Sequence, residues 1–394
     1  MLIDFGPRIW GLGHPAYGSD GTIRFSVQLD SIEGKGEEVT ATLEGYLETP
    51  FIRNMIFLSQ DIPMASVSRS RHRKVREFSV QIPQSTTLQG LQTPVPPSFM
   101  LYDLAGLGCD VKYHVKVHLT GLHGIRVKHD ETKTVTIYYL PKSQPSKPPV
   151  TQLRRPLRDM HGTILCPEFQ NSERTKTITL CPKPPRAALP DASTFQDSVF
   201  LTLPSSLSFT AGQTIPYLFS FVFPTHPHLS TLYSGGCAEV VVKKRLNLSH
   251  PRRRISLKGF TSRCTPDCPE LERPYQLEYG VACSHPKHHS EYEEGVAMLR
   301  GSVETGDAGS QCSWRLGAYA SVEFVLRASI QPPERFADVL PSFEHEEILE
   351  LSTDLWGTLQ RELSSMGGVP TPAVGLRKNQ CPDTSVLDSR IWTI

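Results

Sequence analysis

The residues best suited to metal chemistry lie in a cysteine- and histidine-rich segment in the second half of the chain. Zinc prefers thiolate and imidazole ligands, and both are present there. The first two cysteines are separated by three residues, wider than the commonest zinc knuckle, and no second close pair follows. We therefore interpret the segment as a polar loop and keep a metal site as the alternative. The candidate ligands are Cys264, Cys268, Cys283 and His285, with His288 and His289 close behind them.

Motifs for catalysis or cofactor binding are missing from the sequence. It contains no P-loop, no paired-glycine dinucleotide fingerprint, no His-Glu-x-x-His sequence and no nucleophile elbow. We therefore predict a protein that is not an enzyme and uses no cofactor. A zinc-dependent enzyme built on the cysteine–histidine segment is the alternative.

Two short basic runs could bind acidic groups, because arginine makes bidentate contacts with phosphates and carboxylates. The first run places five cations within eight residues, which repel one another unless a partner neutralises them. The alternative interpretation of the first run is a solvated loop with no binding role. The alternative for the second run is a strand edge whose charges prevent pairing with another chain. The runs consist of Arg69, Arg71, Arg73, Lys74 and Arg76, and of Arg252, Arg253 and Arg254.

A possible phosphorylation site follows the second run. Ser256 comes two residues after Arg254, a spacing typical of substrates of basophilic kinases. We favour the alternative, in which Ser256 lies in a strand and is inaccessible, because the residues leading into Leu257 have strand character.

Composition limits the class of protein. Lys plus Arg is 41 and Asp plus Glu is 40, so net charge supports no attraction to nucleic acid, and we predict no nucleic-acid partner. The nine cysteines are scattered and odd in number, and the N-terminus does not resemble a signal peptide. The longest apolar stretch, Ile215 to Phe223, is too short to span a bilayer. We expect a cytoplasmic protein.

Alternation of apolar and polar residues is the strongest structural signal, and it predicts strands with one buried face. The segment from Val111 to Leu119 is the clearest example. Further strands are predicted at 23–29, 78–82, 132–139, 215–223 and 319–330. Two runs of such strands predict an all-β protein with two β-sandwich domains.

A change in composition separates the two runs of strands. Ten of the 33 prolines fall between Pro141 and Pro190, and proline cannot donate to a sheet ladder. We predict a β-sandwich at 1–142, a proline-rich linker or insertion at 143–195 and a second β-sandwich at 196–352. A short helix from Thr353 to Leu363 and a mobile tail to residue 394 follow, because four apolar residues form one helical stripe.

The order of several segments resembles the arrestin-like family, especially its divergent fungal members. Gly21 to Leu29 resembles an early strand of that family, and 135–141 resembles the end of its N-terminal domain. The most specific match is the succession of Phe78 to Pro83, Val95 to Phe99 and Val111 to Val117. The resemblance covers residues 13–141 well and 198–352 loosely.

The resemblance implies two immunoglobulin-like sandwiches and an adaptor role in membrane-protein trafficking or signalling. Such a protein recruits cargo or receptor tails, with peripheral contact to anionic lipid. The alternative is a structural subunit of a sorting or coat complex, similar to retromer's arrestin-like subunit. The family's Pro-Pro-x-Tyr motif is absent, which argues against a ubiquitin-ligase partner. Only a short piece precedes Pro15, so the presence of the family's opening strand stays open.

Overall fold

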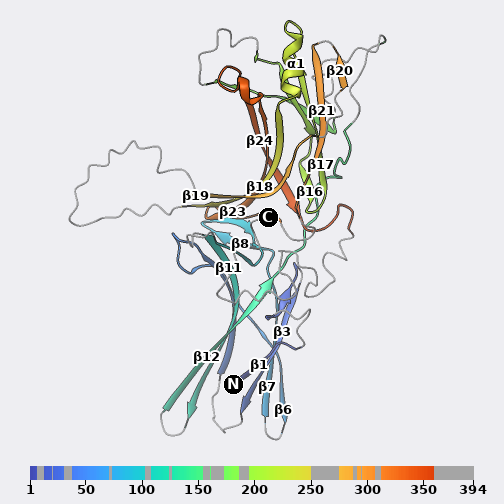
Figure 1. Cartoon of the computed structure of the whole chain (residues 1–394). Helices are drawn as coiled ribbons and strands as arrows, with labels where there is room; N and C mark the ends of the chain where they lie inside the picture. The colour runs from blue at the N-terminus through green and yellow to red at the C-terminus, as the bar shows by residue number, and fades with distance from the viewer. Residues whose placement is uncertain are drawn as a thin grey trace, which may run out of the picture.

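The structure of the chain is a computed structural model. It describes residues 1–6, 13–19, 21–30, 38–70, 73–102, 108–123, 127–153, 160, 173–185, 195–249, 275–286, 291–293, 295–306 and 312–358. Within these ranges nearly every element is a β-strand, which confirms the all-β prediction (Figure 1). No helix in this part of the chain is long and apolar enough to cross a bilayer.

The first group of sheets is built from residues before 142. Its smaller sheet has the strand order β1 (Leu2–Asp4), β3 (Thr22–Asp30), β7 (Arg73–Gln81) and β6 (Met64–Ser70). Its larger sheet contains β2 (Ala16–Tyr17), β12 (Val127–Tyr139), β11 (Gly108–His123), β4 (Glu38–Glu48) and β5 (Met55–Asp61), with β10 (Phe99–Tyr102) paired to β11. β8 (Ser85–Leu88) and β9 (Leu91–Pro94) form a separate two-stranded ribbon.

Alternation explains how these two sheets share a core. Ile23, Phe25 and Val27 of β3 are buried, as are Tyr113 and Val115 of β11. Successive side chains of a strand point to opposite faces, so each sheet turns one apolar face inward. The short strand β1 lies before Pro15 and pairs with β3.

The second group of sheets is built from residues after 174. One sheet has the order β13 (Thr175–Thr179), β15 (Val199–Pro204), β17 (Thr214–Val222), β21 (Val296–Glu304) and β20 (Glu291–Glu293). The other has the order β14 (Pro182–Lys183), β24 (Ser342–Ser352), β23 (Ala320–Gln331), β18 (Cys237–Leu248) and β19 (Tyr275–Ser284). β16 (Ser208–Thr210) adds to β24, and β22 (Trp314–Leu316) adds to β23.

A single short α-helix in the described residues, α1 (Pro227–Ser234), packs on the core of the second group. The ring of its Tyr233 stacks on Phe223 at 5.7 Å between centroids, and its hydroxyl donates to the carbonyl of Pro341 at 2.9 Å. The chain also forms a 3-10 turn at Glu334–Phe336.

Every strand pairing recorded in the described residues stays within one of the two groups. The short strands β13 and β14 fall inside the stretch predicted as a linker, yet they belong to the sheets of the second group. The exact division into domains stays a prediction.

The two groups meet end to end (Figure 1). The rings of Phe99 in the first group and Trp314 in the second meet edge to face at 5.1 Å between centroids. Nearby, Phe51 meets Tyr275 at 5.8 Å. The turn between β8 and β9 also reaches across, since the Gln89 side chain donates to the hydroxyl of Tyr319 at 2.6 Å. Aromatic packing therefore holds much of this junction together.

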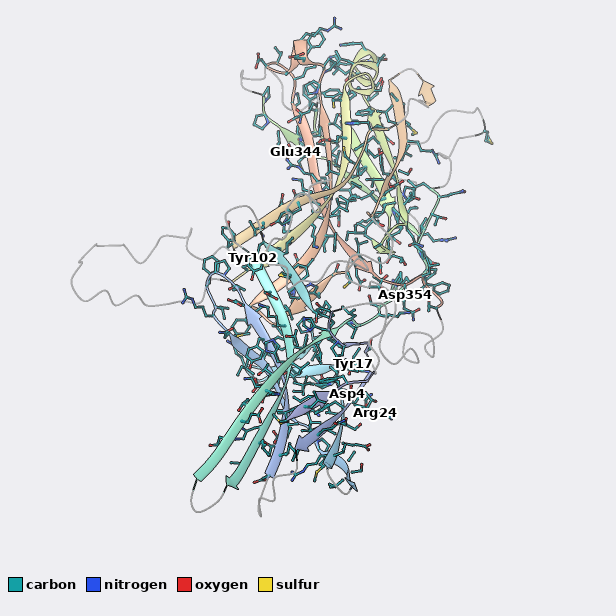
Figure 2. All side chains as sticks on the ribbon, turned by 60° about the horizontal axis from the view of Figure 1, so that its bottom comes forward. Asp4, Tyr17, Arg24, Tyr102, Glu344 and Asp354 are labelled. Carbon is teal, nitrogen blue, oxygen red and sulfur yellow. The ribbon has the colours of Figure 1, made fainter. Side chains whose placement is uncertain are left out.

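A second contact joins the residues that follow β12, the last strand of the first group, to those that follow β24, the last strand of the second group. The Ser143 amide donates to Thr353 Oγ1 at 2.9 Å, and the Asp354 amide donates to the Ser143 carbonyl at 2.8 Å. Lys142 Nζ lies 3.6 Å from the Asp354 carboxylate, which is labelled at the junction in Figure 2. We refer to Lys142, Ser143, Thr353 and Asp354 as the clasp.

The helix predicted from Thr353 does not begin there. Residues 353–358 form bends and turns, and Gly357 has a φ of +86°, which is incompatible with a right-handed helix. Leu355 and Trp356 are 59% and 50% exposed, so this part of the apolar stripe is not buried. Residues 359–363, the rest of the predicted helix, lie outside the described ranges.

Candidate functional site

The first basic run lies on a β-hairpin and not in a loop. Arg69 belongs to β6, and Arg73, Lys74 and Arg76 belong to β7. The loop interpretation of this segment is therefore wrong for these four positions, because the ladder between β6 and β7 extends to the pair Ser70 and Arg73. Arg71 lies outside the described residues.

The pairing of this hairpin concentrates positive charge. Arg69 lies directly opposite Lys74, and Val67 lies opposite Arg76. The hairpin lies at the end of the first group that is remote from the second group (Figure 1).

β6 is the last strand of its sheet. Its outer edge has no neighbouring strand in the described part of the chain, and Met64 and Val67 are each 49% exposed. Ser66 donates its hydroxyl to Glu77 of β7 at 2.6 Å, which joins the two strands on their polar side. A strand of this kind offers main-chain donors and acceptors to an extended peptide.

Several predicted site residues fall where the structure describes nothing. Arg252, Arg253 and Arg254 lie in the stretch from 250 to 274, as do Ser256, Cys264 and Cys268. Their roles stay predictions.

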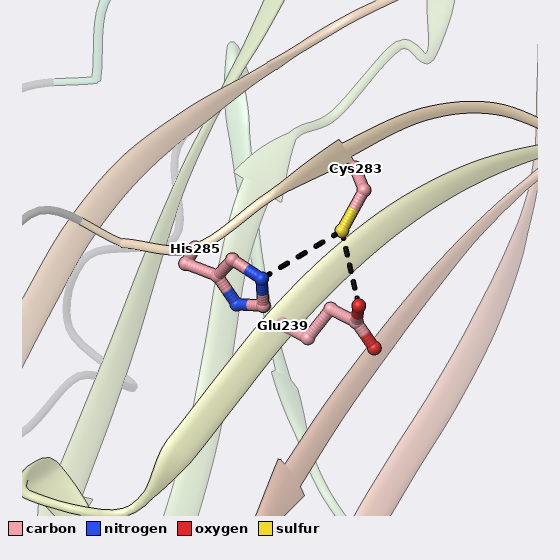
Figure 3. A group of neighbouring side chains, drawn as sticks. All are labelled: Glu239, Cys283 and His285. Atoms are coloured by element: carbon pink, nitrogen blue, oxygen red, sulfur yellow. Dashed lines mark hydrogen bonds between the residues drawn. The ribbon is translucent and has the colours of Figure 1, made fainter. Parts of the chain in front are cut away.

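The other two candidate metal ligands, Cys283 and His285, lie together at the end of β19. Glu239 of β18 joins them, and the three side chains point toward one another (Figure 3). The Cys283 thiol donates to Glu239 Oε1 at 3.0 Å, and its sulfur lies 4.0 Å from His285 Nε2. All three groups are at least partly accessible to solvent.

Strand pairing explains this convergence. Cys283 lies opposite Val241, so the side chain of Cys283 shares a face with Val241 and with Glu239, two residues earlier on β18. His285 comes two residues after Cys283 and reaches the same face. Because Ala238 and Val240 point into the core, Glu239 must point outward.

The electrostatics of the cluster favour a neutral thiol in the absence of a cation. Partial burial, and then the hydrogen bond to Glu239, raise the pKa of Cys283 to about 11. The nearby Cys237 adds to this effect, which places a second thiol close to the first. A bound divalent cation reverses this preference, because metal ligation releases the thiol proton.

A pocket of about 630 Å³ adjoins the cluster. Cys237 and His285 contribute to its wall, together with the two glycines that follow α1. Its other walls come from the end of β23 and the proline-rich turn that follows it. Residues that line it include Gly235, Gly236, Gln331 and Pro333.

Sequence reasoning missed Glu239 and Cys237. Both are 44 or more residues before Cys283 in the chain, and only the register between β18 and β19 brings them close. Nothing in the sequence indicated which strand lies beside the one that carries Glu239.

Comparison with known proteins found no matching family model and no matching curated protein.

Proposed function

We propose that the protein is a non-enzymatic, arrestin-like adaptor that recruits acidic cytoplasmic tails of membrane proteins. The observation that carries the proposal is the open edge of β6, which is one of the two strands of the basic hairpin. The pairs of facing sheets in each half of the chain support it, since an arrestin-like protein is expected to have two immunoglobulin-like sandwiches. The most specific segments of the resemblance lie on or beside β7, β10 and β11.

An extended tail would bind by adding a strand to β6. Main-chain hydrogen bonds along an exposed edge give affinity without requiring a particular sequence, and alternate side chains add selectivity. Met64 and Val67 are exposed on this strand and would contact apolar residues of the tail.

Charge would select acidic tails. By sequence, the hairpin carries five cations between residues 69 and 76, while the whole chain has a formal net charge of only +1. Each Lys or Arg near the surface of an anionic bilayer contributes on the order of 1 kcal/mol, and acidic side chains of a tail attract the same cations.

A cytoplasmic location agrees with the state of the cysteines. Cys109, Cys181, Cys237, Cys283 and Cys312 are all free thiols in the described part of the chain. Free thiols are typical of a reducing compartment.

The test uses the full chain and a fluorescein-labelled peptide of alternating Glu and Val, with a Lys–Val peptide as the charge control. We expect the acidic peptide to bind and the basic one not to, with affinity that falls as salt rises. A variant with Gln at 69, 71, 73, 74 and 76 should lose at least tenfold in affinity. Arg315→Gln, an exposed cation of the second group, should not change the affinity.

Phosphatidylserine vesicles provide the other arm of the experiment. Equal peptide binding by the five-site Gln variant would show that the hairpin is not the site. Vesicle binding without peptide binding would show that the basic hairpin recognises lipid and not tails, and the proposal would be wrong.

A further inference from the structure

The cluster of Glu239, Cys283 and His285 combines three different metal-binding groups at one place. A carboxylate oxygen, a thiol sulfur and an imidazole nitrogen all lie within 4.8 Å of one another. These are ligand types that zinc accepts, and sites with three protein ligands commonly keep a fourth position open. The strands β18 and β19 hold the backbone of two of these residues in a fixed register.

The distances are close to those that a tetrahedral ion requires. Zinc binds sulfur at about 2.3 Å and nitrogen or oxygen at about 2.0–2.2 Å, so neighbouring ligand atoms lie about 3.4–3.6 Å apart. Here Cys283 Sγ lies 3.0 Å from Glu239 Oε1 and 4.0 Å from His285 Nε2. All three ligand atoms lie within 4.8 Å of one another, and side-chain rotations at these partly exposed residues would bring them to the tetrahedral spacing.

The imidazole of His285 is oriented for this role. Its Nδ1 lies 3.3 Å from the carbonyl of Ala238, close enough to donate a hydrogen bond to it. A proton on Nδ1 leaves the lone pair of Nε2 for a ligand, and Nε2 is the atom that faces Cys283. In zinc sites, a ligating histidine commonly donates its other ring N–H to a backbone carbonyl, which fixes the tautomer and the orientation of the ring.

We propose that Glu239, Cys283 and His285 bind a zinc ion, with a fourth coordination position that faces the neighbouring pocket. Of the ligands predicted from sequence, the proposed set contains Cys283 and His285, while Cys264 and Cys268 lie outside the described residues. The pocket that His285 and Cys237 line gives a small ligand or a water access to the ion. This site is separate from the β6 edge, which lies in the other group of sheets.

Zinc at this position would join the end of β19 to β18. Glu239 is near the start of β18, and His285 lies just beyond the last residue of β19. An ion that binds the folded chain and not the unfolded one stabilises the fold by an amount that grows with the logarithm of the free ion concentration once that concentration exceeds the dissociation constant. The melting temperature should therefore rise with zinc concentration and fall again after chelation.

The test is a titration of the chelator-treated full chain with Co²⁺, which reports coordination spectroscopically. We expect one equivalent to give the intense visible bands of a tetrahedral site and a near-ultraviolet band of thiolate ligation. Competing Zn²⁺ should abolish both. Cys283→Ser should lose the thiolate band, and Glu239→Gln and His285→Phe should each weaken cobalt binding at least tenfold.

Two control variants keep the proposal falsifiable. Cys181→Ser removes an exposed free thiol outside the cluster and should leave the spectrum unchanged. The double variant Cys264→Ser/Cys268→Ser should also retain it. If that double variant loses the thiolate band while Cys283→Ser keeps it, the metal binds elsewhere and the proposal is overturned. Melting curves without metal should coincide for all variants, which separates lost ligation from lost folding.

Discussion

Lys244 of β18 lies over the ring of Phe99 of β10, with its ammonium nitrogen 5.0 Å from the ring centroid. The lysine belongs to the second group of sheets and the phenylalanine to the first, so a cation is buried where the two groups meet. The ring face offers it partial compensation for lost hydration. The buried thiol of Cys312 also acts on it electrostatically.

The first prediction concerns pH and follows from the burial of Lys244. Burial lowers the pKa of this lysine from 10.5 to about 8. Below pH 8 both folded and unfolded chains carry the proton, and the folded state bears the cost of burying it. Between about pH 8 and 10.5 the unfolded chain binds more protons, so the free energy of unfolding contributed by Lys244 rises with pH.

Urea unfolding of the native chain and of Lys244→Met across this range measures the effect. The stability of the native chain relative to the variant should rise from pH 8 to 10.5. Both proteins contain buried tyrosines such as Tyr113, whose raised pKa makes stability fall as pH rises. The difference in stability between the two proteins removes this contribution. A constant difference across this range would mean that Lys244 titrates normally.

A second prediction tests a close approach in the core of the second group. Gly301 of β21 lies opposite Tyr217 of β17, and a Cβ on Gly301 would come within 2.3 Å of the tyrosine ring. Tyr217 is fully buried, so a shift of its ring would disturb the surrounding core. We expect Gly301→Ala to lower the free energy of unfolding by about 1–3 kcal/mol.

The matched control is Gly280→Ala, also within a strand, where an added Cβ meets no atom within 4 Å. It should be neutral or slightly stabilising, because alanine restricts the unfolded chain more than glycine. Chemical denaturation of both variants gives the comparison, and equal destabilisation would contradict the packing at Gly301.

A third prediction concerns an ion pair network on the solvent face of the second group. Arg245 contacts the carboxylates of Glu278 at 2.6 Å and of Glu346 at 2.9 Å, and is only 17% exposed. Arg245→Met should lower the free energy of unfolding by about 1 kcal/mol, less at high salt. Arg315, 68% exposed and paired with Glu323, is the control. Its replacement should cost under about 0.5 kcal/mol in the same denaturation assay.

A fourth prediction addresses the aromatic junction. The edge-to-face pair of Phe99 and Trp314 should show a coupling of about 0.5–1.5 kcal/mol in a double-mutant cycle with leucine at each position. The cycle is read from unfolding free energies of the two single variants and the double variant. Additive effects would indicate that the two groups of sheets are not coupled through these rings.

The alternation that predicted strands was informative because it reports burial directly. Val115 and Val117 of β11 are fully buried, as their spacing indicates. The prediction of a helix starting at Thr353 was wrong because it relied on the apolar spacing at 355–363 and ignored Gly357. The positive φ of Gly357 is incompatible with a helix at that position. α1 was missed because only Leu229, Ser230 and Tyr233 face the core over its two turns. Such a segment is too short for helical periodicity to stand out.

The candidate sites were predictable in part. Cys283 and His285 stood out by residue type alone, and the structure brings both to one face. Glu239 could not be found, because cross-strand neighbours depend on a register that a single sequence does not encode locally. The hairpin of the first basic run was hidden for a related reason: a dense run of cations resembles a loop until its partner strand is known.

The clasp also determines how the chain would carry mechanical load. Because Ser143 is hydrogen-bonded to Thr353, the two ends of the segment 143–353 are held together. A force applied between residue 1 and residue 358 would pass through the sheets of the first group and across the clasp. The sheets of the second group would stay outside the path of the force until those hydrogen bonds broke. Breaking the clasp would then place the folded second group under load, and the 210 residues between Ser143 and Thr353 would extend only after its sheets had also unfolded.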